Sequence, residues 1–221
     1  MNYKGLPYRT EWVEYPDIAD VSKKYGVAPT GIRGDGSPRY TLPMIYDPNT
    51  ESAIAESAEI GKYLDATYPS TPKLFQDHTH ALQCGFVDSI LGPQVVMPLA
   101  MNVNPEAISL SPRSLDYIQK GIIATFGKTY PDVGNEGHWK LAEETLGKIK
   151  GWMTMNGPGK ENLITGDVIG FADFQLAATF IWAKAVYGED SAQWARICRW
   201  HDGMWVRYLA QFEKYMAVDN I

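Results

Sequence analysis

Residues 41–69, TLPMIYDPNTESAIAESAEIGKYLDATYP, change from a strand-like to a helical pattern within one short stretch. Residues 40–46 favour a strand, DPNT at 47–50 favours a turn, and residues 51–55 predict the returning strand of a hairpin. From Ser57 onward the apolar residues recur at helical spacing until a proline ends the run. The sequence therefore predicts a hairpin that leads directly into a helix.

Pro43 lies inside the first of these strands, where a trans proline normally breaks the ladder of hydrogen bonds. Two interpretations are open: a trans proline on an edge strand, or a cis Leu42–Pro43 bond that exposes the backbone N–H and C=O of Leu42 to a partner. Ser57 is a favoured N-cap, and the amides of the first helical turn suit a carboxylate. Glu56 beside it can accept a hydrogen bond from an ammonium group. Together these groups fit a small peptide with a free amino-acid end.

The composition excludes several classes of protein. The chain has 221 residues, 45% of them hydrophobic, which is enough for one large domain or two modest ones. It lacks an uninterrupted apolar run of roughly 18 residues and a secretory signal pattern, so we expect no membrane partner. Net charge is −6 without a basic cluster, which argues against nucleic acid as a partner. Cys84 and Cys198 are far apart in the sequence, which favours a reducing, cytoplasmic setting over a disulfide framework.

The pattern divides the chain into two unequal halves, residues 1–75, about the first third, and residues 76–221. The first half holds most of the strand-like runs: besides the hairpin, residues 8–15 predict a strand, and residues 20–39 predict a long connection with a short helix near 21–25. The second half is predicted to be nearly all helix. Its expected helices cover about 78–101 with a kink at Gly92–Pro93, a segment that begins at Ser111–Pro112, 138–155, 171–187, and one or two helices within 191–217.

A second informative block, ITGDVIGFADFQLAATFIWA, spans residues 164–183. Asp173 would occupy the third helical position and bond back to the backbone of the cap, and Ile169 and Phe174 could form a hydrophobic staple. Gly170 stands at the N-cap, where serine or threonine is usual, at a cost of only a few tenths of a kcal/mol. We interpret Asp173 as structural.

The hairpin with its proline, the Glu56–Ser57 pair and the 164–183 block together resemble the glutathione transferases. The opening NYKGLPYRTEWVEYPDI (residues 2–18) and the long loop before LPMIYD are similar to the fungal-specific class A, which is related to bacterial β-etherases. The resemblance covers essentially the whole chain. It implies an α+β, thioredoxin-like N-terminal domain over residues 1–75 and an all-α domain over residues 76–221.

The resemblance also implies roles for named residues. Glu56 and Ser57 would hold the γ-glutamyl group of glutathione, and the backbone of Leu42, before Pro43, would pair with the cysteinyl part. Two arginines are candidates for the glycyl carboxylate: Arg33 and Arg39. Five residues would line the pocket for a hydrophobic acceptor, although each could equally be ordinary core: Phe86, Ile90, Met97, Met101 and Trp182.

The implied function is a glutathione transferase that uses glutathione as co-substrate and conjugates or cleaves aromatic or other hydrophobic electrophiles, such as wood-derived phenolics. The family expectation is a cytoplasmic homodimer. Two alternatives stay open: a ligand-binding protein that holds aromatic compounds without turnover, and a regulatory relative that has lost catalysis. Retention on glutathione and turnover of an aromatic halide separate the three.

In the subclass that this chain resembles, a serine on the first helix activates the thiol, and no residue here matches it. Met1 to Gly5 resembles the end of that helix, so the first strand and most of the first helix would be missing, roughly 20–30 residues on typical element lengths. We therefore expect an N-terminally truncated form, or a natural short form with a non-enzymatic role, and we assign no catalytic residue.

Four weaker motifs favour structural interpretations. GIRGDGSP at 31–38 predicts a plain turn over a phosphate loop, and DHTH at 77–80 predicts a polar helix start over a metal site. Cys84 is expected to be an inert, buried thiol. His201, among tryptophans, is expected to be a satisfied core or surface histidine. We expect no metal.

Overall fold

The predicted hairpin and helix are both present in the computed structural model, which describes residues 1–104, 108, 110–128 and 133–219. Strand β3 (Met44–Asp47) pairs antiparallel with β4 (Ser52–Ala55), and α2 (Ser57–Thr67) follows almost at once. The Leu42–Pro43 peptide bond is cis. The strand predicted over 40–46 begins only at Met44, because Pro43 has no N–H to give to a ladder.

The remaining elements of the first half are short. They are the 3₁₀ turns η1 (Asn2–Lys4) and η2 (Tyr15–Asp17), the helix α1 (Ile18–Lys24), and the strands β1 (Gly31–Ile32) and β2 (Pro38–Arg39). Gly5 closes η1 with a left-handed φ of 64°, as the opening residues predict for a helix end. The β1–β2 hairpin was not predicted. The residues between its strands are the predicted turn, in which Arg33 N donates to Ser37 O and Asp35 accepts from the Ser37 backbone and hydroxyl.

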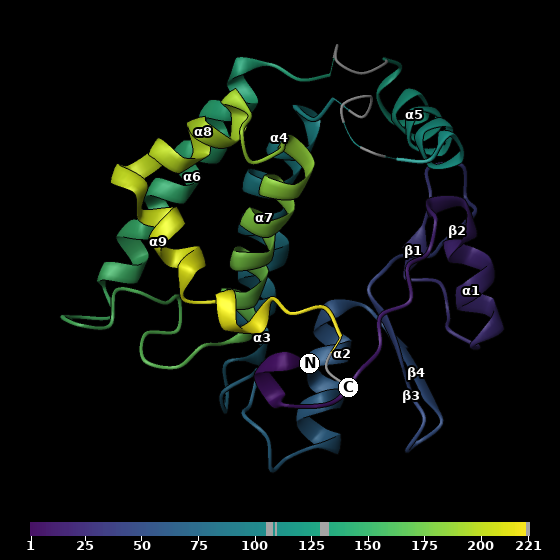
Figure 1. Cartoon of the computed structure of the whole chain (residues 1–221), viewed down its shortest axis with the longest axis horizontal. Helices are drawn as coiled ribbons and strands as arrows, with labels where there is room; N and C mark the ends of the chain where they lie inside the picture. The colour runs from purple at the N-terminus through teal and green to yellow at the C-terminus, as the bar shows by residue number, and fades with distance from the viewer. Residues whose placement is uncertain (105–107, 109, 129–132, 220–221) are drawn as a thin grey trace.

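The strand predicted over residues 8–15 is wrong: only Tyr8 forms an isolated bridge. A strand needs neighbours to be stable, and neither described two-stranded sheet contains this segment. Its polar groups bond instead to the C-terminal tail. The Tyr8 hydroxyl donates to Ala217 O at 2.6 Å, and Thr10 N donates to Asp219 Oδ1 at 2.6 Å. The two ends of the chain consequently lie side by side (Figure 1).

The second half is helical, as predicted. Its helices are α3 (His80–Phe86), α4 (Met97–Met101), α5 (Pro112–Phe126), α6 (Glu136–Thr154), α7 (Phe171–Tyr187), α8 (Ala192–Arg199) and α9 (Met204–Ala210), with 3₁₀ turns at Trp200–Gly203 and Glu213–Tyr215. The core of this half fills the space between α4, α6, α7 and α9 (Figure 1). Leu99, Leu146 and Phe180 are among its fully buried side chains.

Pro93 changes the helix type instead of ending it. A π-helical stretch, η3 (Val87–Val96), joins α3 to α4, so that the chain is helical from His80 to Met101. The wider turn accommodates a residue that lacks an N–H and crowds the preceding carbonyl. By length and composition this one helix of the described chain could cross a membrane. However, Leu91, Val95 and Leu99 are buried in the core of the helical half, so we interpret it as a bundle helix.

Helix α5 lies beside β1, β2 and α1, away from the other helices (Figure 1). It begins as predicted, with the Ser111 hydroxyl accepting from Ser114 N at 3.2 Å. The Glu14 carboxylate accepts hydrogen bonds from both of these serine hydroxyls. Arg113 forms two bonds to Asp17, at 2.6 and 2.9 Å. A helix from the second half of the sequence therefore packs on the first half, and the division at residue 75 stays a prediction.

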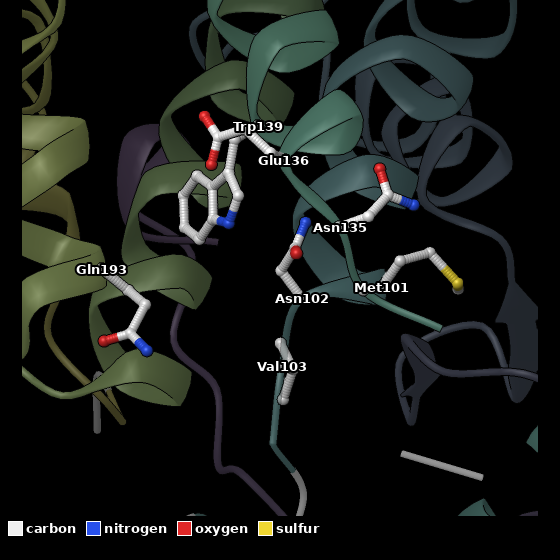
Figure 2. Close-up of a pocket in the computed structure, with 8 residues that line it drawn as sticks. Met101, Asn102, Val103, Asn135, Glu136, Trp139 and Gln193 are labelled. Atoms are coloured by element: carbon white, nitrogen blue, oxygen red, sulfur yellow. The ribbon is translucent and has the colours of Figure 1, made fainter. Parts of the chain in front are cut away.

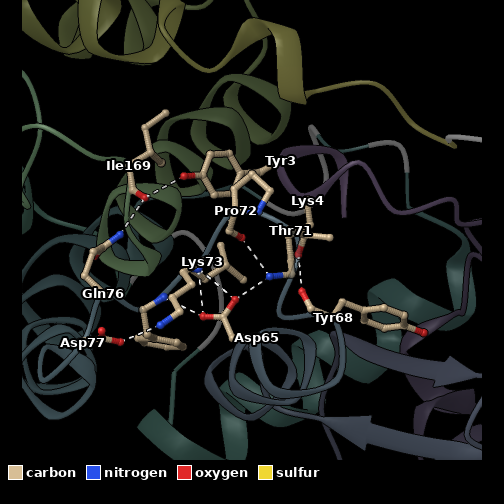
Figure 3. A network of polar contacts seen from close by, with 12 residues as sticks. Tyr3, Lys4, Asp65, Tyr68, Thr71, Pro72, Lys73, Gln76, Asp77 and Ile169 are labelled. Carbon is tan, nitrogen blue, oxygen red and sulfur yellow. Dashed lines mark hydrogen bonds and ion pairs between the residues drawn. The ribbon is translucent and has the colours of Figure 1, made fainter.

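A buried ion pair fastens the start of the chain to α2 and to the linker after it (Figure 3). Lys4 is 4% exposed, and its Nζ lies 2.6 Å from Asp65 Oδ1 and 2.9 Å from Pro72 O. Asp65 also accepts from the backbone N–H groups of Leu74 and Phe75. Because the charges are paired and hydrogen-bonded, their burial is tolerated, and the end of α2 is held firmly.

Candidate functional site

The candidate site is the start of α2, where Glu56 combines an unusual backbone with an exposed carboxylate. Glu56 has φ 72° and ψ 123°, and its C=O accepts from Ile60 N at 2.8 Å, the first hydrogen bond of the helix. Glu56 is therefore the N-cap and Ser57 is the first helical residue, so the prediction of Ser57 as N-cap is wrong by one position. No described side chain caps the first-turn amides of α2, which leaves them available to an anion.

The Glu56 carboxylate is held from the strand side by Thr41. The Thr41 hydroxyl donates to Glu56 Oε1 at 2.6 Å, and it lies 3.0 Å from the hydroxyl of Thr30. Neither threonine was singled out from the sequence. The position of Thr41, directly before Leu42–Pro43, was the only available signal for it.

Leu42 itself lies just outside the β3–β4 ladder, which begins with Met44 opposite Ala55. Leu42 is 41% exposed, and its bond to Pro43 is cis, as in the second of the two interpretations of this stretch. The pairing of the Leu42 backbone with a partner stays a prediction. The Leu42 backbone and the Glu56 carboxylate thus belong to one structural unit, linked through Thr41.

The two candidate arginines differ in what they already contact. Arg33 Nη2 donates to the Tyr117 hydroxyl at 2.5 Å, and its guanidinium lies 5.7 Å from the centre of that ring. Arg39 is exposed and lies across Gly31, where a Cβ would come within 3.1 Å of its Nη2. Within the described part of the chain, the Arg39 guanidinium has no hydrogen-bond or ion-pair partner. Arg39 is therefore the freer of the two cations.

The start of α7 contains the second acidic residue identified from the sequence, and here the prediction of a structural role fits. Asp173 is fully buried and accepts from Gly170 N, Ile164 N and two hydroxyls, those of Thr165 and Tyr208. Burial raises the pKa of this carboxyl, although the four hydrogen bonds act in the opposite direction. The network fixes the loop before α7.

The glycine at the α7 N-cap has a physical reason that the sequence did not show. Gln83, from α3, places its Oε1 2.9 Å from Ala172 N and so supplies the acceptor that a capping serine would provide. A Cβ on Gly170 would lie 2.6 Å from that same Oε1 and 2.8 Å from Thr165 Cγ2. The cap is therefore delivered by another helix, and a side chain at Gly170 would collide with it.

The five residues predicted to line an apolar pocket differ in burial and surroundings. Phe86, Ile90 and Trp182 are half-buried against the helical core, and Met97 is 47% exposed. Met101 lines a cavity of about 330 Å³ whose other walls include Asn102, Trp139 and Gln193 (Figure 2). The acceptor pocket stays a prediction.

The walls of that cavity are both polar and apolar, and most of the polar groups are already bonded within the protein. Asn102 Nδ2 donates to Pro98 O at 2.9 Å, Asn135 Oδ1 accepts from His138 N at 3.2 Å, and Glu136 pairs with Arg196. These contacts cap helices and stabilise their ends. None of the residues that line this cavity belongs to β3, β4 or α2, so it is separate from the candidate site.

Residues of the weaker motifs form contacts within the protein that fit a structural role. Asp77 pairs with Lys73 at 2.7 Å, and His80 packs on Phe75. Within the described residues no group of three His, Cys, Asp or Glu side chains could hold a metal ion. Cys84 and Cys198 are free and half-buried, and burial raises the pKa of both thiols, which disfavours the reactive thiolate.

His201 is a satisfied histidine, as expected. Its Nδ1 accepts from the indole N–H of Trp205 at 2.8 Å. Burial lowers the pKa of its imidazole, which keeps the ring neutral and able to accept this bond.

Two family descriptions of known proteins match the chain. Glutathione S-transferase, N-terminal domain, matches residues 1–67, and glutathione S-transferase, C-terminal domain, matches residues 81–215. The chain belongs to the glutathione S-transferase family. The resemblance identified from the hairpin, Glu56–Ser57 and the α7 start is confirmed, and so is the predicted fold of a thioredoxin-like domain followed by a helical domain.

Relatives of this family member are fungal. Glutathione transferase GSTFuA3 of Phanerochaete chrysosporium is 43% identical, with a TM-score of 0.94 over 99% of this chain and 88% of its own. A glutathione S-transferase of Ceriporiopsis subvermispora, solved in complex with glutathione, is 39% identical, with a TM-score of 0.90 over 100% of this chain and 89% of its own. The glutathione S-transferase-like protein ustS of Aspergillus flavus is 26% identical over 230 residues, covering 92% of this chain and 82% of that protein. The predicted fungal class fits these relatives.

Proposed function

We propose that the chain binds glutathione at the start of α2 and transfers the glutathione sulfur to hydrophobic electrophiles. One observation carries the proposal: at Glu56–Ser57 a partly unoccupied carboxylate and uncapped helix amides are linked through Thr41 to Leu42, an exposed residue just outside the β3–β4 ladder. This arrangement offers separate sites for an ammonium group, a carboxylate and a peptide backbone. Glutathione carries all three in one molecule.

The polar groups of the γ-glutamyl and cysteinyl parts of glutathione would each have a complementary partner in the protein. The ammonium of the γ-glutamyl group would bind Glu56 Oε2, and its α-carboxylate would accept from the Ser57 amide and hydroxyl at the positive end of the helix. The cysteinyl backbone would pair with the N–H and C=O of Leu42 as an added strand. These contacts would fix the thiol at a defined distance from the cis peptide.

Arg39 is the proposed partner of the glycyl carboxylate. Its guanidinium is exposed, and β2 places it two residues before Thr41. Arg33 is less suited, because its guanidinium already donates a hydrogen bond to the Tyr117 hydroxyl. A planar guanidinium can bind a carboxylate through two parallel hydrogen bonds.

The reaction follows from the thiol. Once deprotonated, the glutathione sulfur attacks an electrophilic carbon, a C–S bond forms, and the leaving group departs with its bonding electrons. The thiol proton passes to solvent. Aromatic electrophiles, including phenolic ethers from wood, are the proposed acceptors, and Phe86, Ile90, Met97 and Trp182 remain the proposed apolar contacts. We assign no residue to thiol activation. We also propose that the protein acts in the cytoplasm as a homodimer.

The test is retention of the chain on immobilised glutathione, followed by a conjugation assay with a chromogenic aryl halide. Retention with turnover is the expected result. Retention without turnover would favour a ligand-binding protein over an enzyme. A chain that passes through the column would contradict the proposed site.

Substitutions of Glu56 and Ser57 test whether these two residues bind glutathione. Glu56→Ala and Ser57→Ala should each abolish retention without unfolding the chain, because Glu56 is exposed and Ser57 is only half-buried. Glu59→Ala is the matched control: Glu59 is an exposed acid in the same helical turn, and among the described residues its ion-pair partner is Lys62. Its loss should leave retention unchanged. Normal retention by Glu56→Ala would falsify the site assignment.

A further inference from the structure

Glu56 adopts a backbone conformation that a residue with a side chain rarely takes. Its φ of 72° lies in the left-handed region, which costs about 1–3 kcal/mol and persists only where neighbouring contacts enforce it. One enforcing contact is the bond from Ile60 N to the Glu56 carbonyl. The side chain of Glu56 is held separately, by the hydroxyl of Thr41.

The hydroxyls of Thr41 and Thr30 form a short chain that ends on the carboxylate. Thr41 has one hydroxyl proton, and at 2.6 Å the ionised Glu56 Oε1 is its strongest acceptor. The Thr30 hydroxyl, 3.0 Å away, can then donate to the Thr41 oxygen or to Arg39 O at 3.2 Å. Thr30 is itself fixed by its backbone, since Thr30 N donates to Arg39 O at 2.8 Å.

This chain of hydroxyls determines which carboxylate oxygen is available. Thr41 occupies Oε1, and Oε2 has no partner among the residues that the structure describes. A flexible, exposed glutamate would otherwise sample several rotamers and lose entropy on binding. Because Thr41 directly precedes Leu42, the same residue links the ammonium site to the backbone that would hold the cysteinyl part.

We propose that Thr41 is a positioning residue, which orients Glu56 so that Oε2 meets the ammonium group of the γ-glutamyl moiety, with Thr30 holding Thr41 in place. This proposal rests on the proposed function, because it assumes that glutathione binds at Glu56. It goes further because it assigns part of the affinity for glutathione to a threonine that contacts Glu56 and does not contact the ligand.

The test compares two ligands on two variants by calorimetry. Thr41→Val keeps the shape of the side chain and removes its hydroxyl, whereas Thr41→Ser keeps the hydroxyl. The ligands are glutathione and its deamino analogue, in which a glutaryl group replaces the γ-glutamyl group and no ammonium is present. Thr41→Val should weaken the binding of glutathione by about five- to tenfold, which is within the net worth of one ordinary hydrogen bond, and leave the binding of the analogue unchanged. Thr41→Ser should bind glutathione like the wild type.

Two further variants complete the design. Thr30→Val should also weaken the binding of glutathione, but by less than Thr41→Val, because Thr30 is one hydrogen bond further from Glu56. Thr125→Val is the control, since in the described part of the chain its hydroxyl bonds within α5, to Gly121 O. Unfolding transitions of all variants should coincide with that of the wild type.

The outcomes separate this proposal from the one on which it depends. Equal binding of glutathione by Thr41→Val and the wild type would overturn the positioning role, and so would equal losses for both ligands. If the wild-type chain binds glutathione and the deamino analogue equally, Glu56 does not bind the ammonium, and the role of Thr41 fails together with that contact. If the wild-type chain binds neither ligand, the proposed function itself fails.

Discussion

The acids at the starts of α2 and α7 are used in opposite ways. At α7, Asp173 is fully buried, and its oxygens accept hydrogen bonds from two backbone amides and two hydroxyls. At α2, Glu56 is exposed and accepts one side-chain bond, from Thr41. Both residues are acidic and both adjoin a helix N-terminus, so the sequence alone makes them look alike.

The difference lies in whether the fold itself satisfies the carboxylate. A carboxylate has about four acceptor sites, and the surroundings of Asp173 fill them from within the protein. Glu56 and the uncapped amides beside it leave acceptors and donors for a ligand. We therefore expect substitutions at α7 to affect stability and substitutions at α2 to affect binding.

The largest expected effect is at α7. Asp173→Ala should lower the free energy of unfolding by about 3 kcal/mol or more, because four buried or half-buried donors lose their acceptor together. Urea denaturation measures this change. Asp167→Ala in the same loop removes an exposed acid paired with Lys160 and should cost under about 1 kcal/mol. A loss of similar size in both variants would contradict the contrast between the two helix starts.

The second prediction concerns the cap that Gln83 supplies. Gly170→Ser introduces the residue that is usually best at an N-cap, yet it should destabilise by about 1–3 kcal/mol, since its Cβ would press on Gln83 and Thr165. Gln83→Ala should cost about 1–2 kcal/mol through the loss of the acceptor for Ala172 N. Thermal denaturation of both variants is the measurement. A stabilised Gly170→Ser variant would show that α7 lacks an acceptor, and the two helix starts would then be alike.

The third prediction sharpens the account of α2. Arg39→Met should weaken the binding of glutathione by about fivefold, because the bond to the glycyl carboxylate is lost. Arg33→Met should have little effect on binding, because Arg33 already donates to the Tyr117 hydroxyl. Calorimetric titration of the two variants side by side decides between the arginines. The reverse order of losses would assign the carboxylate to Arg33.

The smallest expected effect is at a third helix start, α5. Hydrogen bonds from Ser111 and Ser114 lower the pKa of the Glu14 carboxyl. A lowered folded-state pKa means that the stabilisation is complete above the ordinary glutamate pKa of about 4.3 and is lost as pH falls through the folded value. The drop in melting temperature between pH 7 and pH 3.5 should therefore be smaller in Glu14→Gln than in the wild type. Identical acid sensitivity would mean that Glu14 does not hold α5.

The sequence predicted the elements whose pattern is local. The turn after β3, the start of α2 to within one residue, the Ser111 cap and the Asp173 position all follow from residues within a few positions of one another. The cis bond at Leu42–Pro43 was one of two interpretations, and the structure decided between them.

Contacts between distant segments could not be predicted. No periodicity links Gln83 to Ala172, Lys4 to Asp65 or Thr41 to Glu56, because each pair meets only after the chain has folded. The strand predicted over 8–15 failed for the same reason: alternation shows that a segment can form a strand, whereas pairing depends on a neighbour.

The most direct test of the account is an amide chemical-shift titration of the isotopically labelled chain with glutathione. We predict that the largest shifts fall on the amides of Leu42, Ser57 and the first turn of α2, and that Asp173 and its partners do not move. Shifts centred on the cavity beside Asn102 and Trp139, or no shifts at α2, would contradict the assignment of Glu56 and Ser57 as the glutathione site.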